Sequence, residues 1–246
     1  MKKICDIKTR GELADFLKIP RQKFTQILYS IYPNNCYTTF EIPKKKGGTR
    51  SISAPNDELK EIQHRIAKVL SDYKQTILED NHIENKISHA FEKGKSIISN
   101  AEVHKNKKLV LNVDLKNFFD SFHFGRVCGY LEKNKYFMLP HEVAVILTQL
   151  SCYEGKLPQG APTSPIITNL MCQILDAKII SLSKKYKLSY TRYADNLTFS
   201  TNNRQFIDKY NEFVKRLGKI INYEGFEINK EKTRLQYNDA RQVVTG

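Results

Sequence analysis

Two aspartates in this sequence stand in apolar, aromatic stretches where a carboxylate is unusual. Asp195 lies in "SYTRYADNLTFS", residues 189–200, and Asp114 lies in "KKLVLNVDLKNFFDSF", residues 107–122. A buried carboxylate is costly unless it is paired or binds a cation. If adjacent antiparallel strands bring the two acids together, their charges repel unless a hard cation such as Mg²⁺ lies between them. An isolated Asp in a turn is more often a cap, so this interpretation depends on the rest of the chain.

The overall charge favours a polyanionic partner. The 246 residues include 40 Lys and Arg against 26 Asp and Glu, which gives a formal net charge of +14 and a pI near 9.4. An excess of this size fits nucleic acid, and a soluble basic surface is the simpler alternative. With 40% hydrophobic residues, the composition is that of a folded globular protein.

Cysteine usage and hydropathy bear on the compartment. The five cysteines include no C-x-x-C pair, which indicates reduced thiols and argues against a zinc site. No apolar run approaches the roughly 18 residues of a membrane span. The N-terminus has two lysines but no apolar signal region. We therefore expect a cytoplasmic protein without a membrane partner.

Strands and turns must position the two acids. The pattern predicts a strand over 109–113 that ends at Asp114, two strands over 189–200 that meet at a turn around 194–196, and a strand pair or strand-loop over 226–237. Two β-rich segments between 37 and 55 flank a basic tip and predict a hairpin. Helices are predicted in the first forty residues and over 56–73, 124–134, 141–152, within 153–186 and over 204–225. This mixture indicates an α+β fold.

Three motifs resemble those of reverse transcriptases, in the order found there. "YADN" resembles the Y-x-D-D motif of the polymerase palm with its last acid replaced, and "NVDLKNFFDSF" resembles the first catalytic motif. "LPQGAPTSPIITNL" resembles the loop and helix that contact the incoming nucleotide and the template. "NAEVH", residues 100–104, and "VTG", residues 244–246, resemble elements that mark the bacterial retron type. The resemblance extends from about Tyr37 to the last residue.

This resemblance implies a right-hand polymerase palm, an antiparallel sheet with packed helices, plus a mixed fingers subdomain. It implies an N-terminal helical segment over 1–36, fingers over 37–105 and a palm over 106–246, with a fingers-like helical insertion at about 125–157. In the family a helical thumb follows the V-T-G element. Because the printed sequence stops at Gly246, we expect fingers and palm without the thumb.

By resemblance, the catalytic residues are Asp114, Asp195, Asn196 and Lys232. The two aspartates would bind two Mg²⁺ ions, with Mn²⁺ as the alternative metal, and the Leu115 carbonyl and Asn196 would complete the metal shell. Lys232 matches the position of the general acid toward the departing pyrophosphate. For this residue a plain surface lysine is nearly as good an explanation.

The resemblance also implies nucleotide and nucleic-acid contacts. Phe119 corresponds to the steric gate against a ribose 2′-OH, with a core aromatic as the alternative. Arg50 matches the arginine that clamps the triphosphate, because a planar guanidinium suits bidentate phosphate contact. Gln159 and Gly160, with Leu115, line the nucleotide pocket, where a residue without Cβ lets the backbone approach a ligand. The expected nucleic-acid contacts are Lys44, Lys45, Lys46, Asn100, His104 and Tyr193. For Asn100 and His104 the role is either structural or RNA recognition.

The implied function is an RNA-directed DNA polymerase of anti-phage defence. It would copy its structured noncoding RNA into single-stranded DNA from dNTPs, stay bound to the RNA–DNA product, and work with an effector protein. Asn196 offers a neutral amide where the family has a carboxylate, and one lost contact of this kind costs roughly 3–4 kcal/mol. Strongly reduced synthesis is therefore expected. Two alternatives stay open: an inactive palm-fold scaffold that binds RNA or RNA–DNA, and another prokaryotic reverse transcriptase of the group II intron, abortive-infection or diversity-generating type.

Overall fold

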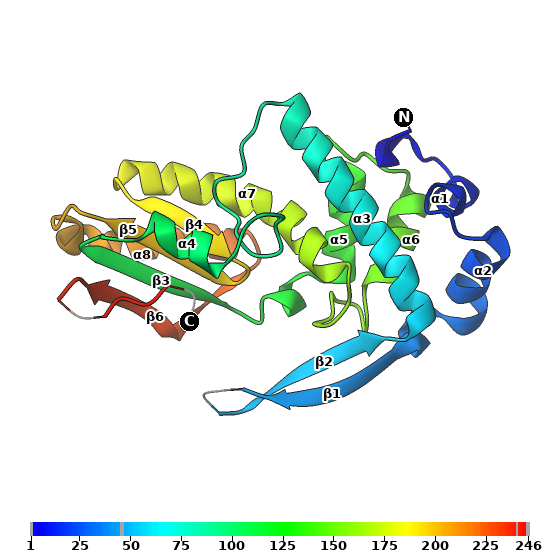
Figure 1. Ribbon diagram of the computed structural model, residues 1–246, viewed down its shortest axis with the longest axis horizontal. Helices are drawn as coiled ribbons and strands as arrows, with labels where there is room; N and C mark the ends of the chain where they lie inside the picture. Colours follow the sequence, from blue (N-terminus) through cyan, green and yellow to red (C-terminus); the bar gives the residue numbers. More distant parts are fainter. Residues whose placement is uncertain (1, 45–46, 240, 245–246) are drawn as a thin grey trace. The chain divides into compact units, whose positions relative to one another are not determined.

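The structure, a computed structural model, describes residues 2–44, 47–239 and 241–244. The chain forms two compact units (Figure 1). Unit 1 consists of Met1–Ile83 and Phe119–Leu170, and unit 2 consists of Glu84–Phe118 and Met171–Gly246. Each unit is built from two segments that are distant in sequence, and the segments of the two units alternate along the chain.

Unit 1 is mainly helical. Its helices within the described residues are η1 (Ile4–Asp6), α1 (Arg10–Phe16), α2 (Arg21–Gln26), the π-helix η2 (Ile27–Ile31), η3 (Pro33–Cys36), α3 (Asp57–Asp80), η4 (Phe119–Ser121), α5 (Phe124–Lys133) and α6 (His141–Ser151). The long helix α3 begins after Asn56, whose side chain accepts a hydrogen bond from the Leu59 N–H at 3.0 Å. Its apolar face is buried, as the helical spacing predicts, through Leu59, Ile62, Ile66 and Leu70.

The predicted hairpin is confirmed in unit 1. Strands β1 (Tyr37–Pro43) and β2 (Thr49–Pro55) pair antiparallel over their whole length. Most of their side chains are exposed. Strand β2 is tied to a later loop of the same unit, because the Ser53 N–H donates to the Gln159 carbonyl oxygen at 2.8 Å. Strand β1 is tied to α3, because Gln63 Nε2 donates to the Tyr37 hydroxyl at 2.6 Å.

Unit 2 is built on a four-stranded antiparallel sheet with the order β4–β5–β3–β6 (Figure 1). The strands are β3 (Leu109–Lys116), β4 (Ser189–Tyr193), β5 (Asn196–Thr201) and β6 (Glu227–Tyr237). The helices of this unit are α4 (Ile97–Val103), α8 (Phe206–Tyr223) and α7 (Ser164–Lys185) from Met171 onward. Phe213 of α8 meets Phe199 of β5 edge-on, with ring centroids 5.2 Å apart. The prediction of an α+β fold with helices packed on an antiparallel sheet is confirmed.

Helix α7 is the most apolar long helix of the described residues. By length and composition α7 could cross a membrane, and among the described residues it is the one helix that meets both criteria. Within the structure, however, 67% of its apolar window is buried. A core helix has the same properties, so the hydropathy of α7 follows from its packing.

Two sequence-based boundaries are wrong. Strand β3 does not end at Asp114 but continues to Lys116, because the Leu115 N–H donates to the Asp195 carbonyl oxygen at 2.9 Å and residues 114–116 pair with 227–229. The segment 226–237 is not a strand pair but the single strand β6. Its pairing with β3 is interrupted between Asn112 and Asp114, whose partners are Arg234 and Asn229. The extra residues of β6 form an irregularity of the β-bulge kind, which the residue types do not reveal.

Candidate active site

The two acidic motifs meet at one end of the sheet in unit 2. Asp114 of β3 lies directly opposite Asn196, the first residue of β5, in an antiparallel register. The bond from the Leu115 N–H to the Asp195 carbonyl oxygen fixes the turn before β5 against β3. Adjacent antiparallel strands therefore bring Asp114 and Asp195 together, as the sequence predicts. We call this end of the sheet, with Asp114, Asp195, Asn196 and the nearby Lys232, the acidic end, after its two aspartates.

A tight turn carries Asp195. Only Ala194 and Asp195 separate β4 from β5, and Tyr193 pairs with Asn196 across the turn. Ala194 has φ +54°, in the left-handed region that a residue with a Cβ adopts at a cost. The Asn196 side-chain amide donates to the Asp195 carboxylate, Nδ2 to Oδ1, at 3.0 Å. Asn196 thus supports Asp195 as a hydrogen-bond donor, which a carboxylate at this position would do only if protonated.

The irregularity in β6 brings a cation to the same place. Lys232 lies in the stretch between the two registers of β6, and its Nζ is 3.3 Å from Asp114 Oδ2. Asp114 is only 7% exposed, whereas the Lys232 side chain is 64% exposed. A buried carboxylate therefore faces a largely exposed ammonium and not a buried partner.

The oxygen atoms at the acidic end suit a hard divalent cation. Asp114 and Asp195 contribute carboxylates from two elements, and Asn196 contributes an amide oxygen, which are ligand types that Mg²⁺ prefers. Lys232 and the Asn196 amide each use one of these carboxylate oxygens. A bound cation would require those two side chains to turn away, and both lie at least partly exposed.

Behind the acidic end lies a buried ion pair that sequence reasoning missed. Arg192 of β4 is 1% exposed and forms a two-pronged contact with Asp176 of α7, Nε to Oδ1 and Nη2 to Oδ2, both at 2.9 Å. The Tyr190 hydroxyl donates to the same carboxylate at 2.8 Å. Arg192 Nη1 also donates to the Ala194 carbonyl oxygen at 3.4 Å, in the turn that carries Asp195. The pair therefore connects α7 to the turn of the candidate site.

Burial and the charge of Asp176 shift the pKa values of the side chains around this ion pair. Burial is the largest single influence on the pKa of the Arg192 guanidinium and lowers it, but the charge and hydrogen bond of Asp176, together with the nearby Cys172 and Tyr190, raise the pKa overall. Burial, with the charge of Asp176, raises the pKa of the Tyr190 hydroxyl well above its usual value. The sequence gives no clear signal for this network, because Asp176 has Lys178 two residues away and Arg192 has Asp195 three residues away. Neither charge therefore stands out as one that must be paired in the core.

The first and last residues of the element "NAEVH", Asn100 and His104, are buried in unit 2. His104 follows α4 and contacts two strands, Nδ1 to the Ser200 hydroxyl at 2.8 Å and Nε2 to the Thr191 hydroxyl at 2.7 Å. Burial lowers the pKa of His104 to about 4, and nearby His89 adds to this effect. Asn100 is fully buried. Neither side chain is accessible to nucleic acid, so of the two roles predicted for Asn100 and His104 these positions support the structural one.

Val243, the residue before the element "VTG", contacts the sheet of unit 2. The Val243 carbonyl oxygen accepts from Asn112 Nδ2 at 2.8 Å and from Gln236 Nε2 at 2.9 Å. The Val243 N–H donates to Gln236 Oε1 at 2.8 Å. Of the element itself, Val244 belongs to the described residues, whereas Thr245 and Gly246 lie outside them.

The residues predicted to contact the nucleotide belong to unit 1, apart from Leu115. Arg50 is exposed on β2, three residues before Ser53, which donates to Gln159. Gly160 has φ +125°, and a Cβ there would lie 2.7 Å from the Ser53 carbonyl oxygen, so only glycine fits. Gln159 and Gly160 thus lie against β2, the strand that carries Arg50. Phe119 is half-buried in η4, whereas Phe118 is a core residue stacked on Phe226.

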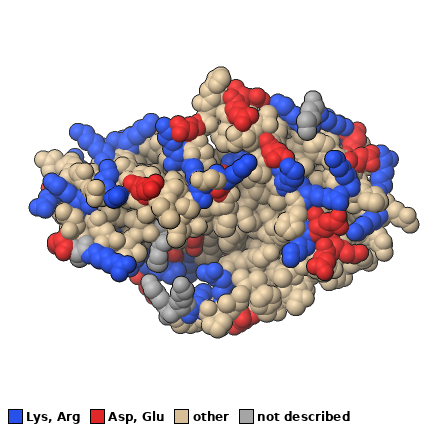
Figure 2. Space-filling model, viewed as in Figure 1, with Lys and Arg blue, Asp and Glu red and all other residues tan. Residues whose placement is uncertain are grey.

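The predicted nucleic-acid contacts differ in exposure. Lys44 is exposed at the tip of the hairpin, and Lys45 and Lys46 lie outside the described residues. Tyr193 is half-buried at the end of β4, next to the turn that carries Asp195. Figure 2 shows Lys and Arg side chains spread widely over one face, with smaller groups of Asp and Glu among them. This distribution fits extended contact with a phosphate backbone.

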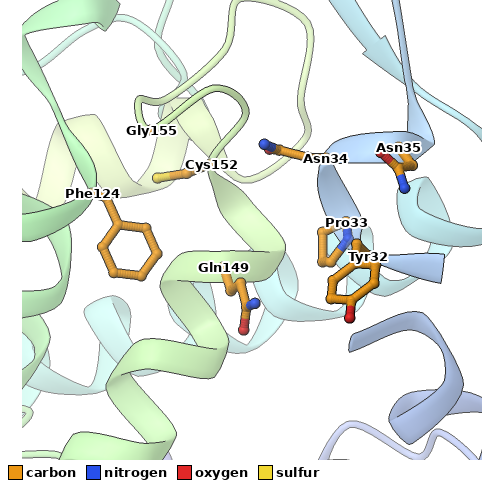
Figure 3. Close-up of a pocket in the computed structure, with 8 residues that line it drawn as sticks. All are labelled: Tyr32, Pro33, Asn34, Asn35, Phe124, Gln149, Cys152 and Gly155. Carbon is orange, nitrogen blue, oxygen red and sulfur yellow. The ribbon is translucent and has the colours of Figure 1, made fainter. Parts of the chain in front are cut away.

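A cavity of about 410 Å³ lies in unit 1, and none of the predicted site residues lines it (Figure 3). Its lining residues are Tyr32, Pro33, Asn34, Asn35, Phe124, Gln149, Cys152 and Gly155. Burial raises the pKa of the Cys152 thiol to about 12, so this group stays protonated. No Asp, Glu, Lys, Arg or His lines the cavity among the described residues. It therefore lacks the acid and base groups that polymerase chemistry needs.

Comparison with known proteins points to one family. Residues 42–243 match the family model described as reverse transcriptase (RNA-dependent DNA polymerase). The chain is similar to the Retron Mx65 and Retron Mx162 reverse transcriptases of Myxococcus xanthus, with 34% and 36% identity over 85% of this chain. It is also similar to the Retron Ec86 reverse transcriptase of Escherichia coli, with 33% identity over 96% of this chain. The chain spans 50% and 46% of the two Myxococcus proteins and 70% of the Escherichia protein.

Proposed function

This chain belongs to the retron-type reverse transcriptases, and we propose that it acts as an RNA-directed DNA polymerase at the acidic end of the sheet in unit 2. The single observation that carries this proposal is the antiparallel register that sets Asp114 opposite Asn196, with Asp195 in the adjoining turn. Two carboxylates held close together at one end of a sheet destabilise the fold, because their charges repel. The same pair is well suited to binding divalent cations that contact the phosphates of a nucleotide.

Reverse transcriptases generally use divalent metal ions. In this chain Asp114 and Asp195 would hold Mg²⁺, or Mn²⁺ in its place, with the Leu115 carbonyl and the Asn196 amide oxygen as further ligands. The bound metal would supply activation of the primer hydroxyl and stabilisation of the charge on the leaving pyrophosphate. Lys232 would leave Asp114 when the metal is held and would face the phosphates, where its ammonium donates a proton to the leaving group.

Unit 1 would bind the nucleotide. Arg50 on β2 would contact the triphosphate through its guanidinium, and the backbone at Gln159 and Gly160 would approach the nucleotide closely because position 160 carries no Cβ. The half-buried Phe119 would exclude a ribose 2′-OH. In this proposal residues 37–105 are the fingers and 106–246 the palm, with the helical insertion at about 125–157.

Partners follow from the family and from the charge. We propose that the chain binds a structured noncoding RNA as template and primer, uses dNTPs, and remains on the RNA–DNA product in anti-phage defence together with an effector protein. The net charge of +14 supports a nucleic-acid partner. The exposed Lys44 at the hairpin tip is suited to backbone contact, as is Tyr193 beside the site.

Asn196 lowers the expected activity. With one carboxylate fewer, the site adds less negative charge against two dications, so synthesis is expected to be strongly reduced. The competing hypothesis, a palm-fold scaffold that binds RNA without synthesis, is favoured by the same residue. Primer extension on an RNA template, with Mg²⁺ and dNTPs, separates the two hypotheses. The proteins to compare are this chain, Asn196→Asp, and the double variant Asp114→Asn/Asn196→Asp as the matched control.

If the proposal is right, Asn196→Asp extends primers about 10²–10³ times faster than the unchanged chain, and the double variant loses this gain. If neither the chain nor Asn196→Asp extends a primer, while both still bind the RNA, the polymerase proposal fails and the scaffold hypothesis replaces it.

A further inference from the structure

Three side chains of the kinds that bind metal ions meet in unit 1, and none of them is a predicted site residue. Cys128 and Glu132 are four residues apart on α5 and so lie on one face of that helix. His141 is the first residue of α6. The ligand atoms of these three residues all lie within 4.8 Å of one another. Sequence reasoning set zinc aside because no cysteine pair is present, and it could not find a trio that joins two helices.

The contacts within the trio converge on one carboxylate oxygen. Glu132 Oε1 accepts from the Cys128 thiol at 3.7 Å and lies 2.5 Å from His141 Nδ1. A thiol is a weak donor, so its bond to the carboxylate adds little stability. Sulfur, nitrogen and oxygen ligands around one point are the donor set that Zn²⁺ takes in proteins.

The backbone beneath the trio is already ordered. The Leu139 N–H donates to the Leu131 carbonyl oxygen at 3.0 Å, which closes the loop between α5 and α6. Leu131, Phe137 and Leu139 are buried and anchor this loop in the core of unit 1. Glu132 and His141 therefore project from a preformed frame, and little conformational entropy would be lost when a metal binds.

The distances suit a small tetrahedral ion. With zinc bond lengths of about 2.0–2.3 Å, ligand atoms around a tetrahedral centre are about 3.3–3.5 Å apart. The separation of 3.7 Å between Cys128 Sγ and Glu132 Oε1 is close to this value. His141 Nδ1 is nearer to the carboxylate than a bound ion would allow, but its side chain is 81% exposed and free to move outward.

We propose that Cys128, Glu132 and His141 form a binding site for a borderline-soft divalent metal ion, with Zn²⁺ as the ion its donor set fits. On binding, the Cys128 thiol releases its proton to solvent and the thiolate becomes a ligand. Solvent fills the fourth position, because the side of the site at His141 is open. The ion joins the last turn of α5 to the first turn of α6. This inference is independent of the proposed polymerase function.

The test uses Co²⁺ as a spectroscopic probe on the whole metal-free chain. A thiolate bound to Co²⁺ gives an intense charge-transfer absorption in the near ultraviolet, which the oxygen ligands at Asp114 and Asp195 cannot give. We expect this absorption to saturate at one equivalent per chain and to be abolished when Zn²⁺ displaces Co²⁺. Zn²⁺ is also expected to raise the thermal unfolding midpoint, since it binds the folded state.

Four variants sharpen this test. Cys128→Ser should abolish the absorption, and His141→Gln, at an exposed position, should weaken Co²⁺ binding about tenfold or more. Cys152→Ser, at another buried cysteine of unit 1, and His64→Gln, at an exposed histidine of α3, should change nothing. Absence of the absorption at excess Co²⁺, or its persistence in a folded Cys128→Ser protein, would show that the trio is only a hydrogen-bonded cluster. Circular dichroism establishes that each variant is folded.

Discussion

Unit 2 holds two low-exposure aspartates that differ in the partner the chain provides. Asp176 faces Arg192, a cation as buried as itself, and also accepts from Tyr190. Asp114 faces Lys232, whose ammonium reaches it from solvent across 3.3 Å. Both carboxylates are thus next to a positive charge, but only the first charge is held there by packing.

The difference separates a structural carboxylate from one that is available to a ligand. A buried pair with a two-pronged contact has no coordination left for an incoming ion, and neither partner can leave without exposing a buried charge. A carboxylate whose partner is solvated can exchange that partner for a metal at small cost. The exposed fraction of the counter-charge, more than the burial of the acid, therefore indicates which aspartate is available to a ligand.

The largest expected effect is on the buried pair. Arg192→Met leaves the Asp176 carboxylate buried without its cation, and we expect the free energy of unfolding to fall by about 3–5 kcal/mol. Urea unfolding followed by circular dichroism measures this change. In the double variant Asp176→Leu/Arg192→Met no buried charge remains, so a large part of the loss should be recovered. A loss below about 1 kcal/mol in Arg192→Met would remove the distinction between the two aspartates.

The next effect concerns His104, a buried side chain whose hydrogen-bond partners are hydroxyl groups and not charged groups. His104 has its pKa lowered to about 4 in the folded protein, against about 6.5 when unfolded. The unfolded chain therefore binds the extra proton first, and stability is lost as the pH falls from about 6.5 to about 4, by roughly 3 kcal/mol in all. His89, whose pKa is also lowered mainly by burial, acts in the same direction.

Replacing His104 tests this linkage. In His104→Gln the difference in unfolding free energy between pH 7 and pH 4.5 should be smaller than in the unchanged chain, because one titrating group is gone. Urea unfolding at the two pH values measures the difference. His64→Gln, at an exposed histidine, is the matched control and should keep the full pH dependence. Equal pH dependence in all three proteins would mean that His104 titrates normally when folded.

A moderate effect is expected at the acidic end. Asn196→Asp places a third carboxylate beside Asp114 and Asp195 and removes the amide that donates to Asp195. Without divalent cations this change should lower the free energy of unfolding by about 1–2 kcal/mol through repulsion. Added Mg²⁺ should restore the stability, since it binds the folded state. Asn196→Ala, which adds no charge, should show no comparable gain from Mg²⁺. If Mg²⁺ does not stabilise Asn196→Asp, the result contradicts a cation site here.

The smallest effect is expected for the exposed counter-charge. Lys232→Met removes the partner of Asp114, yet the free energy of unfolding should change by only about 0–1 kcal/mol, because the ammonium is mostly solvated. Thermal or urea unfolding of Lys232→Met beside Arg192→Met makes the comparison direct. A loss as large as that of Arg192→Met would show that Lys232 is a structural partner after all.

Local patterns were enough for much of the molecule. Helix α3 and the hairpin follow from apolar spacing and from β-rich segments on both sides of a Gly-containing tip, which are properties of neighbouring residues. The convergence of Asp114 and Asp195 was also predictable, because both stand in strand-like motifs whose order matches a known family. The helix and the hairpin need no knowledge of which distant elements pair, whereas for the two aspartates the resemblance to the family supplied that knowledge.

The rest depended on pairings between elements far apart in the chain. The irregular register of β6 brings Lys232 to Asp114, and the residue types of β6 do not predict this irregularity. The contacts of Arg192 with Asp176, and of His104 with the hydroxyls of β4 and β5, arise only when helices settle on the sheet. The sequence by itself thus determined which residues carry charge and which segments become strands or helices. Tertiary structure alone decided which charge faces which, because burial and counter-charge are properties of the packed chain.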